Sequence, residues 1–192
     1  MLALASCANR GIGPQGGPQD TIPPVVVKEI PLNASVMYKG KTVEVIFDEY
    51  IQLDNIQTNV LISPPQQIAP EIKAIGKKLS VEFQEELQDS TTYTIDFGAA
   101  ICDYNERVPL EGYVFSFATG DHIDSLSISG SVYDAATLRP MPAMLVGIHR
   151  NLDDSALNTI PFTRITRTNS DGVFTIHNVQ PGRYQQAPGK RQ

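Results

Sequence analysis

The sequence predicts an all-β protein made of antiparallel β-sandwich domains in series. Apolar and polar residues alternate with a period of two over many short stretches, as they do in strands buried on one face. These stretches follow one another at short, fairly regular spacing, and no long amphipathic helical pattern interrupts them. The 192 residues include 14 Gly and 14 Pro, which suits short strands joined by turns better than a helical bundle.

The alternation is clearest over residues 77–98. Leu79, Val81 and Phe83 alternate with polar residues, and residues 93–97 repeat the pattern after a polar connector. We predict two antiparallel strands joined by a turn, with their apolar faces against a second sheet. Residues 48–55 predict an irregular segment or one helical turn. The other strands predicted in the first domain, residues 24–119, cover 25–30, 36–38, 42–47, 59–63, 71–75 and 113–117.

Three parts of the first domain carry a family resemblance: Phe47-Asp48-Glu49, the strand Thr91–Ile95 and the closing run Phe115–Thr119. With these, residues 22–120 resemble the bacterial Ig-like domain of the surface-layer (SbsA-like) type. The resemblance implies an extracytoplasmic β-sandwich without catalytic residues, often a spacer or adhesion module. Residues 16–24 are also similar to the leader of Gram-negative envelope lipoproteins that carry this domain.

The second domain is predicted over residues 125–184, with strands near 126–132, 143–148, 163–168 and 173–176 and a further one beginning at 179. Three of its motifs are Gly130–Asp134, Asp171–Phe174 and Pro181–Tyr184. They resemble the signature of the carboxypeptidase regulatory-like (transthyretin-like) domain, which implies a second β-sandwich.

The polar end of the chain departs from that family. Residues 185–192, QQAPGKRQ, are rich in breakers where the family continues with further strands. We predict a disordered tail here and an incomplete second domain, from either a gene fragment or a frameshifted ending. Such a domain would leave an unpaired sheet edge and be marginally stable.

The N-terminal residues predict a lipid anchor. Leu4-Ala5-Ser6-Cys7 resembles the lipobox of bacterial lipoproteins, in which signal peptidase cuts before the Cys and its thiol carries a diacylglycerol. Residues 1–7 lack the charged and apolar regions of a complete signal peptide, so we predict that residues 1–7 are a signal peptide truncated at its N-terminus. Residues 8–23, rich in Gly and Pro, predict a flexible linker. No segment has the ~20 consecutive apolar residues of a membrane-spanning helix, so we predict anchoring through Cys7.

Candidate reaction centres are weak. Asp121, His122 and Asp124 could begin a metal site, but their place between two domains favours a solvated linker. Residues 169–172 resemble part of a calcium loop without its closing Glu, and a hairpin turn is the favoured interpretation. Cys102 is predicted to be a packing residue. Asp48 and Glu49 could be a general acid and a general base, but adjacent residues on a strand face opposite ways, so the two carboxylates would not act on one substrate. We predict no catalytic, metal or cofactor residues and no enzyme activity.

The net charge of −6 argues against nucleic acid as a partner, because phosphate binding calls for clustered Lys and Arg. The favoured function is a lipid-anchored cell-envelope protein, at the outer membrane or cell surface, whose Ig-like domain acts as a spacer, adhesion or binding module. Its partners would be the membrane and another envelope protein or a glycan. The alternative is a set of accessory domains of a larger extracytoplasmic hydrolase or transport assembly.

Overall fold

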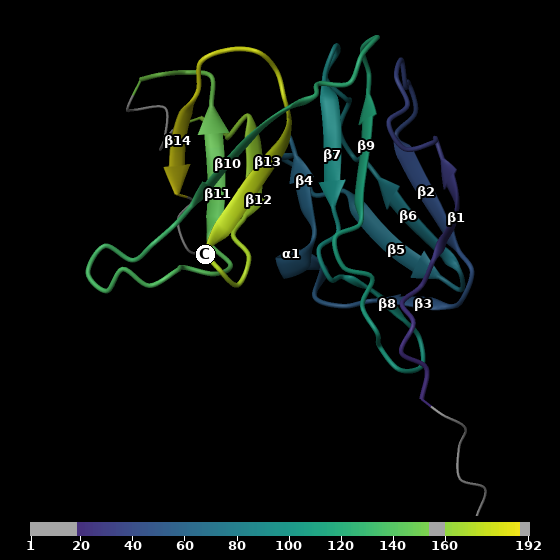
Figure 1. Cartoon of the computed structure of the whole chain (residues 1–192). Coiled ribbons are helices and arrows are strands. Elements are labelled where there is room, and N and C mark those ends of the chain that lie inside the picture. The colour runs from purple at the N-terminus through teal and green to yellow at the C-terminus, as the bar shows by residue number, and fades with distance from the viewer. Residues whose placement is uncertain (1–18, 154–159, 189–192) are drawn as a thin grey trace, which may run out of the picture.

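The computed structural model describes residues 19–153 and 160–188, so Cys7 lies outside the described residues (Figure 1). These residues form strands, connecting loops and one helical turn, α1 (Ile56–Asn59), which confirms the all-β prediction. The strands of the first domain are β1 (Val26–Ile30), β2 (Thr42–Phe47), β3 (Ile51–Leu53), β4 (Leu61–Ser63), β5 (Glu71–Ile75), β6 (Lys78–Glu82), β7 (Thr92–Asp96), β8 (Ile101–Asp103) and β9 (Val114–Ala118). The strands of the second domain are β10 (Leu126–Ser131), β11 (Leu145–His149), β12 (Arg164–Arg167), β13 (Val173–Val179) and β14 (Gln185–Pro188).

The first domain is an antiparallel sandwich. One sheet has the strand order β1-β2-β6-β5 and the other has the order β4-β7-β9. The short pair β3–β8 lies at one end of the sandwich (Figure 1). No helix among the described residues has the length and apolar character needed to cross a bilayer.

The core of the sandwich contains the side chains that the alternation predicts to face inward. Burying each such side chain stabilises the fold by roughly 1.5–3 kcal/mol. The side chains at predicted inward positions that are at most 2% exposed are Val43, Val45, Phe47, Leu79, Val81, Phe83, Tyr93, Ile95 and Phe97.

The predicted pairing of the strands in residues 77–98 is wrong. β6 pairs with β2 and β5, whereas β7 pairs with β4 and β9 in the other sheet. The connector between β6 and β7 is too long for a tight hairpin turn and carries the chain from one sheet to the other. Phe83 and Tyr93 therefore meet across the sandwich, with ring centroids 5.5 Å apart.

Two local predictions in the first domain also change. Residues 48–55 contain the strand β3, and the helical turn α1 follows them. Residues 36–38 form no strand; the adjacent Ser35 makes an isolated bridge to Phe117. The predicted hairpin across residues 76–78 is confirmed, because β5 and β6 pair from Ile75–Lys78 to Glu71–Glu82.

The second domain has two small sheets, β12-β11-β14 and β10-β13, around the buried side chains of Val146, Ile148, Phe174 and Ile176. The prediction of a disordered tail from residue 185 is wrong for residues 185–188. They form β14, which pairs with β11 from His149–Gln185 to Val146–Pro188. Main-chain pairing needs no apolar side chains, and Ala187 is the buried member of a short alternation.

Candidate functional site at the domain junction

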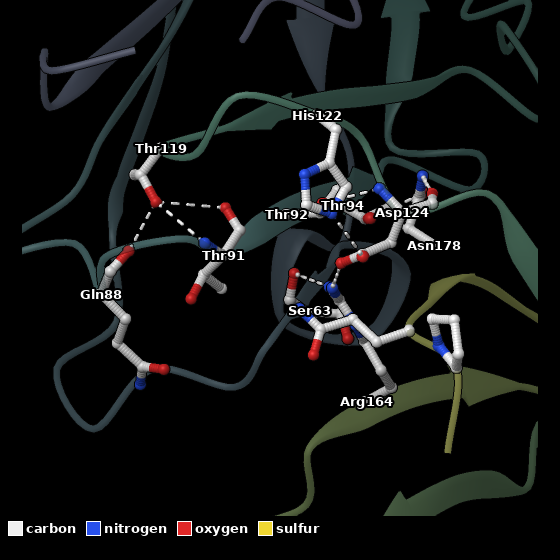
Figure 2. A network of polar contacts seen from close by, with 12 residues as sticks. Ser63, Gln88, Thr91, Thr92, Thr94, Thr119, His122, Asp124, Arg164 and Asn178 are labelled. Carbon is white, nitrogen blue, oxygen red and sulfur yellow. Dashed lines mark hydrogen bonds and ion pairs between the residues drawn. The ribbon is translucent and has the colours of Figure 1, made fainter. Parts of the chain in front are cut away.

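A cluster of polar side chains joins the two domains (Figure 2). Strand β12 of the second domain lies beside β4 of the first, and β13 approaches β7 (Figure 1). The linker between the domains passes over this contact. The residues that meet there are Ser63, Thr92, Thr94, Asp124, Arg164 and Asn178.

Arg164 is the central residue of the cluster. It is 4% exposed, and its Nη1 donates a hydrogen bond of 3.0 Å to the carbonyl oxygen of Ser63 in the first domain. Its Nη2 lies 3.6 Å from Oδ2 of Asp124, which is 5% exposed. Burial lowers the pKa of Arg164, and the Asp124 carboxylate opposes that shift. An arginine remains charged despite such a shift, so this is a buried ion pair between the linker and the second domain.

Main-chain and amide hydrogen bonds complete the junction. The backbone N–H of Ile165 donates to Oγ of Ser63 at 3.2 Å, and that of Asp124 donates to Oγ1 of Thr92 at 3.0 Å. Asn178 donates from Nδ2 to the carbonyl oxygen of Asp124 at 2.8 Å and accepts from Oγ1 of Thr94 at 2.9 Å. Asn178 has φ 57°, a left-handed conformation that Asn tolerates better than most residues. It thereby joins β13 to both the linker and β7.

The sequence predicts that residues 121–124 are a solvated linker, and the structure bears this out only for Asp121 and His122. Asp121 and His122 are exposed, with Oδ1 of Asp121 2.7 Å from Nδ1 of His122, and this hydrogen bond raises the pKa of His122. Asp124 instead points inward to Arg164, while its Oδ1 lies 3.7 Å from Nε2 of His122. Among the described residues, no group of three His, Cys, Asp or Glu side chains could hold a metal ion.

A cleft of about 480 Å³ opens between the domains beside this cluster. Glu85 and Asp89 of the first domain line it, together with Arg150 and Tyr184 of the second. The guanidinium of Arg150 lies 5.9 Å from the ring centre of Tyr184, and its Nε donates to the tyrosine hydroxyl at 3.3 Å. The described residues that line the cleft include Ser, Thr and Tyr hydroxyl groups but no His or Cys. Charges of both signs and hydrogen-bonding groups suit it to holding a polar surface.

The other predicted sites have simple structural roles where they are described. Residues 169–172 form a tight turn, in which Oδ1 of Asn169 accepts the backbone N–H groups of Asp171 and Val173. Gly172 has φ 72° there. Cys102 is buried, and burial raises the pKa of its thiol. Oδ1 of Asp48 accepts the backbone N–H of Val25, at the entry to β1.

A carboxylate that sequence reasoning missed lies at the end of β8. Asp103 is 2% exposed and accepts the backbone N–H groups of Asn105, Glu106 and Val108, at 2.8, 2.7 and 2.6 Å. Burial favours the neutral acid, but these donors outweigh it and hold the pKa of Asp103 below its ordinary value. An Asp followed by Asn two residues later is the only sequence signal for this turn.

We expect Asp103→Asn to lower the free energy of unfolding by roughly 1–2 kcal/mol at neutral pH, because its amide replaces an oxygen that accepts a backbone N–H. A depressed pKa stabilises the fold above the unfolded-state value, near pH 4, and this stabilisation is lost as pH falls through the folded-state value. Urea unfolding of both proteins should therefore differ most at neutral pH and converge below about pH 4. The exposed Asp89→Asn is the control, and an equal loss there would contradict the role of Asp103.

The fold and the junction define a class of protein: an all-β chain whose first sandwich is joined to a second β-domain through a buried polar cluster. A model of the bacterial Ig-like domain matches residues 20–119, which are 100 of the 192 residues. The chain belongs to the bacterial Ig-like domain family. Such domains are typical of extracellular and cell-surface proteins. No curated protein matches the sequence, and the resemblance of the second domain to a transthyretin-like domain stays a prediction.

The solved structures that the chain matches are distant. An L,D-transpeptidase from Mycobacterium smegmatis is 14% identical, with 77% of each chain covered and a TM-score of 0.35. BcpA, the major pilin subunit of Bacillus cereus, is 13% identical over 87% of this chain and 59% of its own, with a TM-score of 0.26. The T6 backbone pilin of serotype M6 Streptococcus pyogenes is 9% identical over 85% and 46%, also with a TM-score of 0.26. The chain thus spans less than two thirds of either pilin.

Proposed function

We propose that this protein is a non-catalytic spacer and binding module of the bacterial cell envelope. The observation that carries the proposal is the buried junction at Arg164. Contacts between domains of one chain usually permit relative motion unless the interface is extensive. Here a buried ion pair and direct hydrogen bonds from β4, β7 and the linker oppose that motion. A fixed pair of domains suits a module that holds a binding surface at a set distance, and Arg164→Met, argued in the Discussion, tests it.

The cleft between the domains is the surface we propose for a partner, either another envelope protein or a glycan. Both walls contribute charged side chains, with the carboxylates of Glu85 and Asp89 on one and Arg150 on the other. A partner seated there would touch both domains at once, so binding would depend on their fixed arrangement. This links the rigidity of the junction to recognition.

We further propose that a lipid on Cys7 anchors the protein, which places the two domains beyond a linker of residues 8–23 at the outer membrane or cell surface. Support comes from the sequence Leu4-Ala5-Ser6-Cys7 and the Gly- and Pro-rich residues that follow it. Each buried methylene of an acyl chain contributes roughly 0.8 kcal/mol to membrane binding, so a multiply acylated Cys would hold firmly.

Metabolic labelling with a fatty acid tests the anchor. The chain would be expressed in a Gram-negative host behind a complete signal peptide that ends directly before Cys7. We expect the purified protein to carry label and to sediment with membranes, and Cys7→Ser to lose both properties. Cys102→Ser is the matched control and should keep the label, since Cys102 is buried in the first domain. An unlabelled parent protein, or label retained by Cys7→Ser, would refute the anchor.

A further inference from the structure

The long edge strands of the first domain carry features that prevent pairing with another chain. β1 has a break in register beside Lys28, and β5 carries an exposed ion pair in which Nζ of Lys73 lies 2.7 Å from Oε1 of Glu71. The edge of β9 is covered by residues 34–38, which form backbone hydrogen bonds with Ser116 and Ala118. Charges, irregularities and covering segments are the usual means by which a sheet edge avoids association.

Strand β10 of the second domain has none of these features. It pairs with β13 alone among the described strands, and thus forms the edge of a two-stranded sheet. Its residues include no charge and no proline, and none of them is buried. The pairing of β10 with β13 has one irregularity: residues 126–128 of β10 lie opposite residues 176–179 of β13. The additional residue is on β13, so β10 itself stays regular. A long, regular, neutral edge is a template for strand addition.

The sequence of this edge is complementary to itself. Residues 125–131 read SLSISGS, which is symmetric in its serines about Ile128. If two copies pair antiparallel about Ile128, each serine lies opposite a serine, and the two Ile128 side chains are opposite each other. Leu126, which is 49% exposed, lies opposite Gly130 of the copy, where the ring of Phe174 from β13 fills the space that a side chain would take. Serine pairs across strands can exchange hydrogen bonds.

We propose that a second copy of this chain binds along β10, pairing antiparallel in the register 126–130, 128–128. The two copies are related by a two-fold axis, so the contact is closed and stops at a dimer. It merges the two β10–β13 sheets into one sheet of four strands. A neutral strand suits this occupant, because in this register a charged residue at position 128 would lie opposite the same charge on the copy.

The contact is small, which predicts a weak dimer that forms at high protein concentration. A single strand pair buries less surface than the interfaces of stable complexes. The net charge of −6 on each copy adds repulsion that salt screens. Association should therefore strengthen as ionic strength rises, the opposite of what contacts between oppositely charged surfaces would show.

Sedimentation velocity of the whole chain over a concentration series tests the proposal. The parent protein should shift from monomer to dimer as concentration rises. Ser127→Lys with Ser129→Lys places like charges opposite each other in the proposed register and should raise the dissociation constant at least tenfold, equal to about 1.4 kcal/mol. Ser127→Lys with Ser129→Glu places opposite charges together at the same two positions and should restore dimerisation.

The comparison of these variants separates the register from effects on folding, because both carry two charges at the same positions and circular dichroism reports their folding. Gln57→Lys with Thr58→Lys adds the same charge at exposed positions of α1 in the first domain and should leave the dimer intact. A parent protein that stays monomeric throughout overturns the proposal. So does a dimer that the two lysines on α1 weaken as much, or one that the Lys–Glu variant fails to restore.

Discussion

Replacing Phe117 with alanine should lower the free energy of unfolding of the first domain by about 3–5 kcal/mol, the usual cost of removing a large buried aromatic side chain. Phe117 is 0% exposed and lies at the centre of the aromatic core. Its ring stacks on Tyr93 with centroids 5.2 Å apart, and it meets Phe83 and Tyr38 edge to face at 5.7 and 5.2 Å. Rings from three other segments of the chain surround the site, so the neighbours cannot collapse into the space without breaking their own contacts.

Urea unfolding followed by circular dichroism measures this loss, since the chain contains no Trp for fluorescence. Phe117→Leu keeps most of the volume and should cost considerably less than the alanine variant. Tyr104→Ala removes an aromatic side chain that is 63% exposed, and its effect should stay within about 0.5 kcal/mol. A Phe117→Ala protein as stable as Tyr104→Ala would show that the aromatic core is not packed as described.

The period-two alternation predicted which side chains of the first domain are buried, but not that β6 and β7 belong to different sheets. Leu79 and Tyr93 both face inward as predicted, because burial depends on the side chain and its face alone. Whether the connector turns back or crosses the sandwich depends on the partners that β6 and β7 find far away in the chain. β14 was missed for a similar reason, since main-chain hydrogen bonds to β11 require no apolar signal.

The junction was missed because its residues are distant in sequence. Arg164 and Ser63 are far apart along the chain, and no local pattern relates them. One signal was present in residues 164–168, where Arg164, Thr166 and Thr168 alternate with Ile165. The alternation suggests an apolar face on Ile165, but Arg164, Thr166 and Thr168 are the buried residues. A strand that buries its polar face packs against polar groups elsewhere: Arg164 bonds to the first domain, and Thr168 bonds to Met141 and Met144 within the second domain.

Replacing Arg164 with methionine should destabilise the junction by about 3 kcal/mol or more, because it leaves Asp124 buried without its cation. Methionine keeps an unbranched apolar stem in place of that of arginine, so less packing is lost than in an alanine variant. The hydrogen bond to the carbonyl oxygen of Ser63 is lost as well. We expect unfolding in urea to change from one transition to two as the domains uncouple, and small-angle X-ray scattering to show a larger radius of gyration.

Two further variants determine how much of the effect belongs to the ion pair. Adding Asp124→Asn to Arg164→Met removes the unpaired charge and should recover part of the stability, because an uncompensated buried charge costs more than a neutral amide. Arg167→Met is the matched control on the same strand, where Nη1 donates to the carbonyl oxygen of Ala143 within the second domain. It should leave the radius of gyration unchanged. If Arg164→Met leaves both the unfolding and the scattering of the parent protein unchanged, the domains are not held by this pair, and the rigid-spacer proposal is wrong.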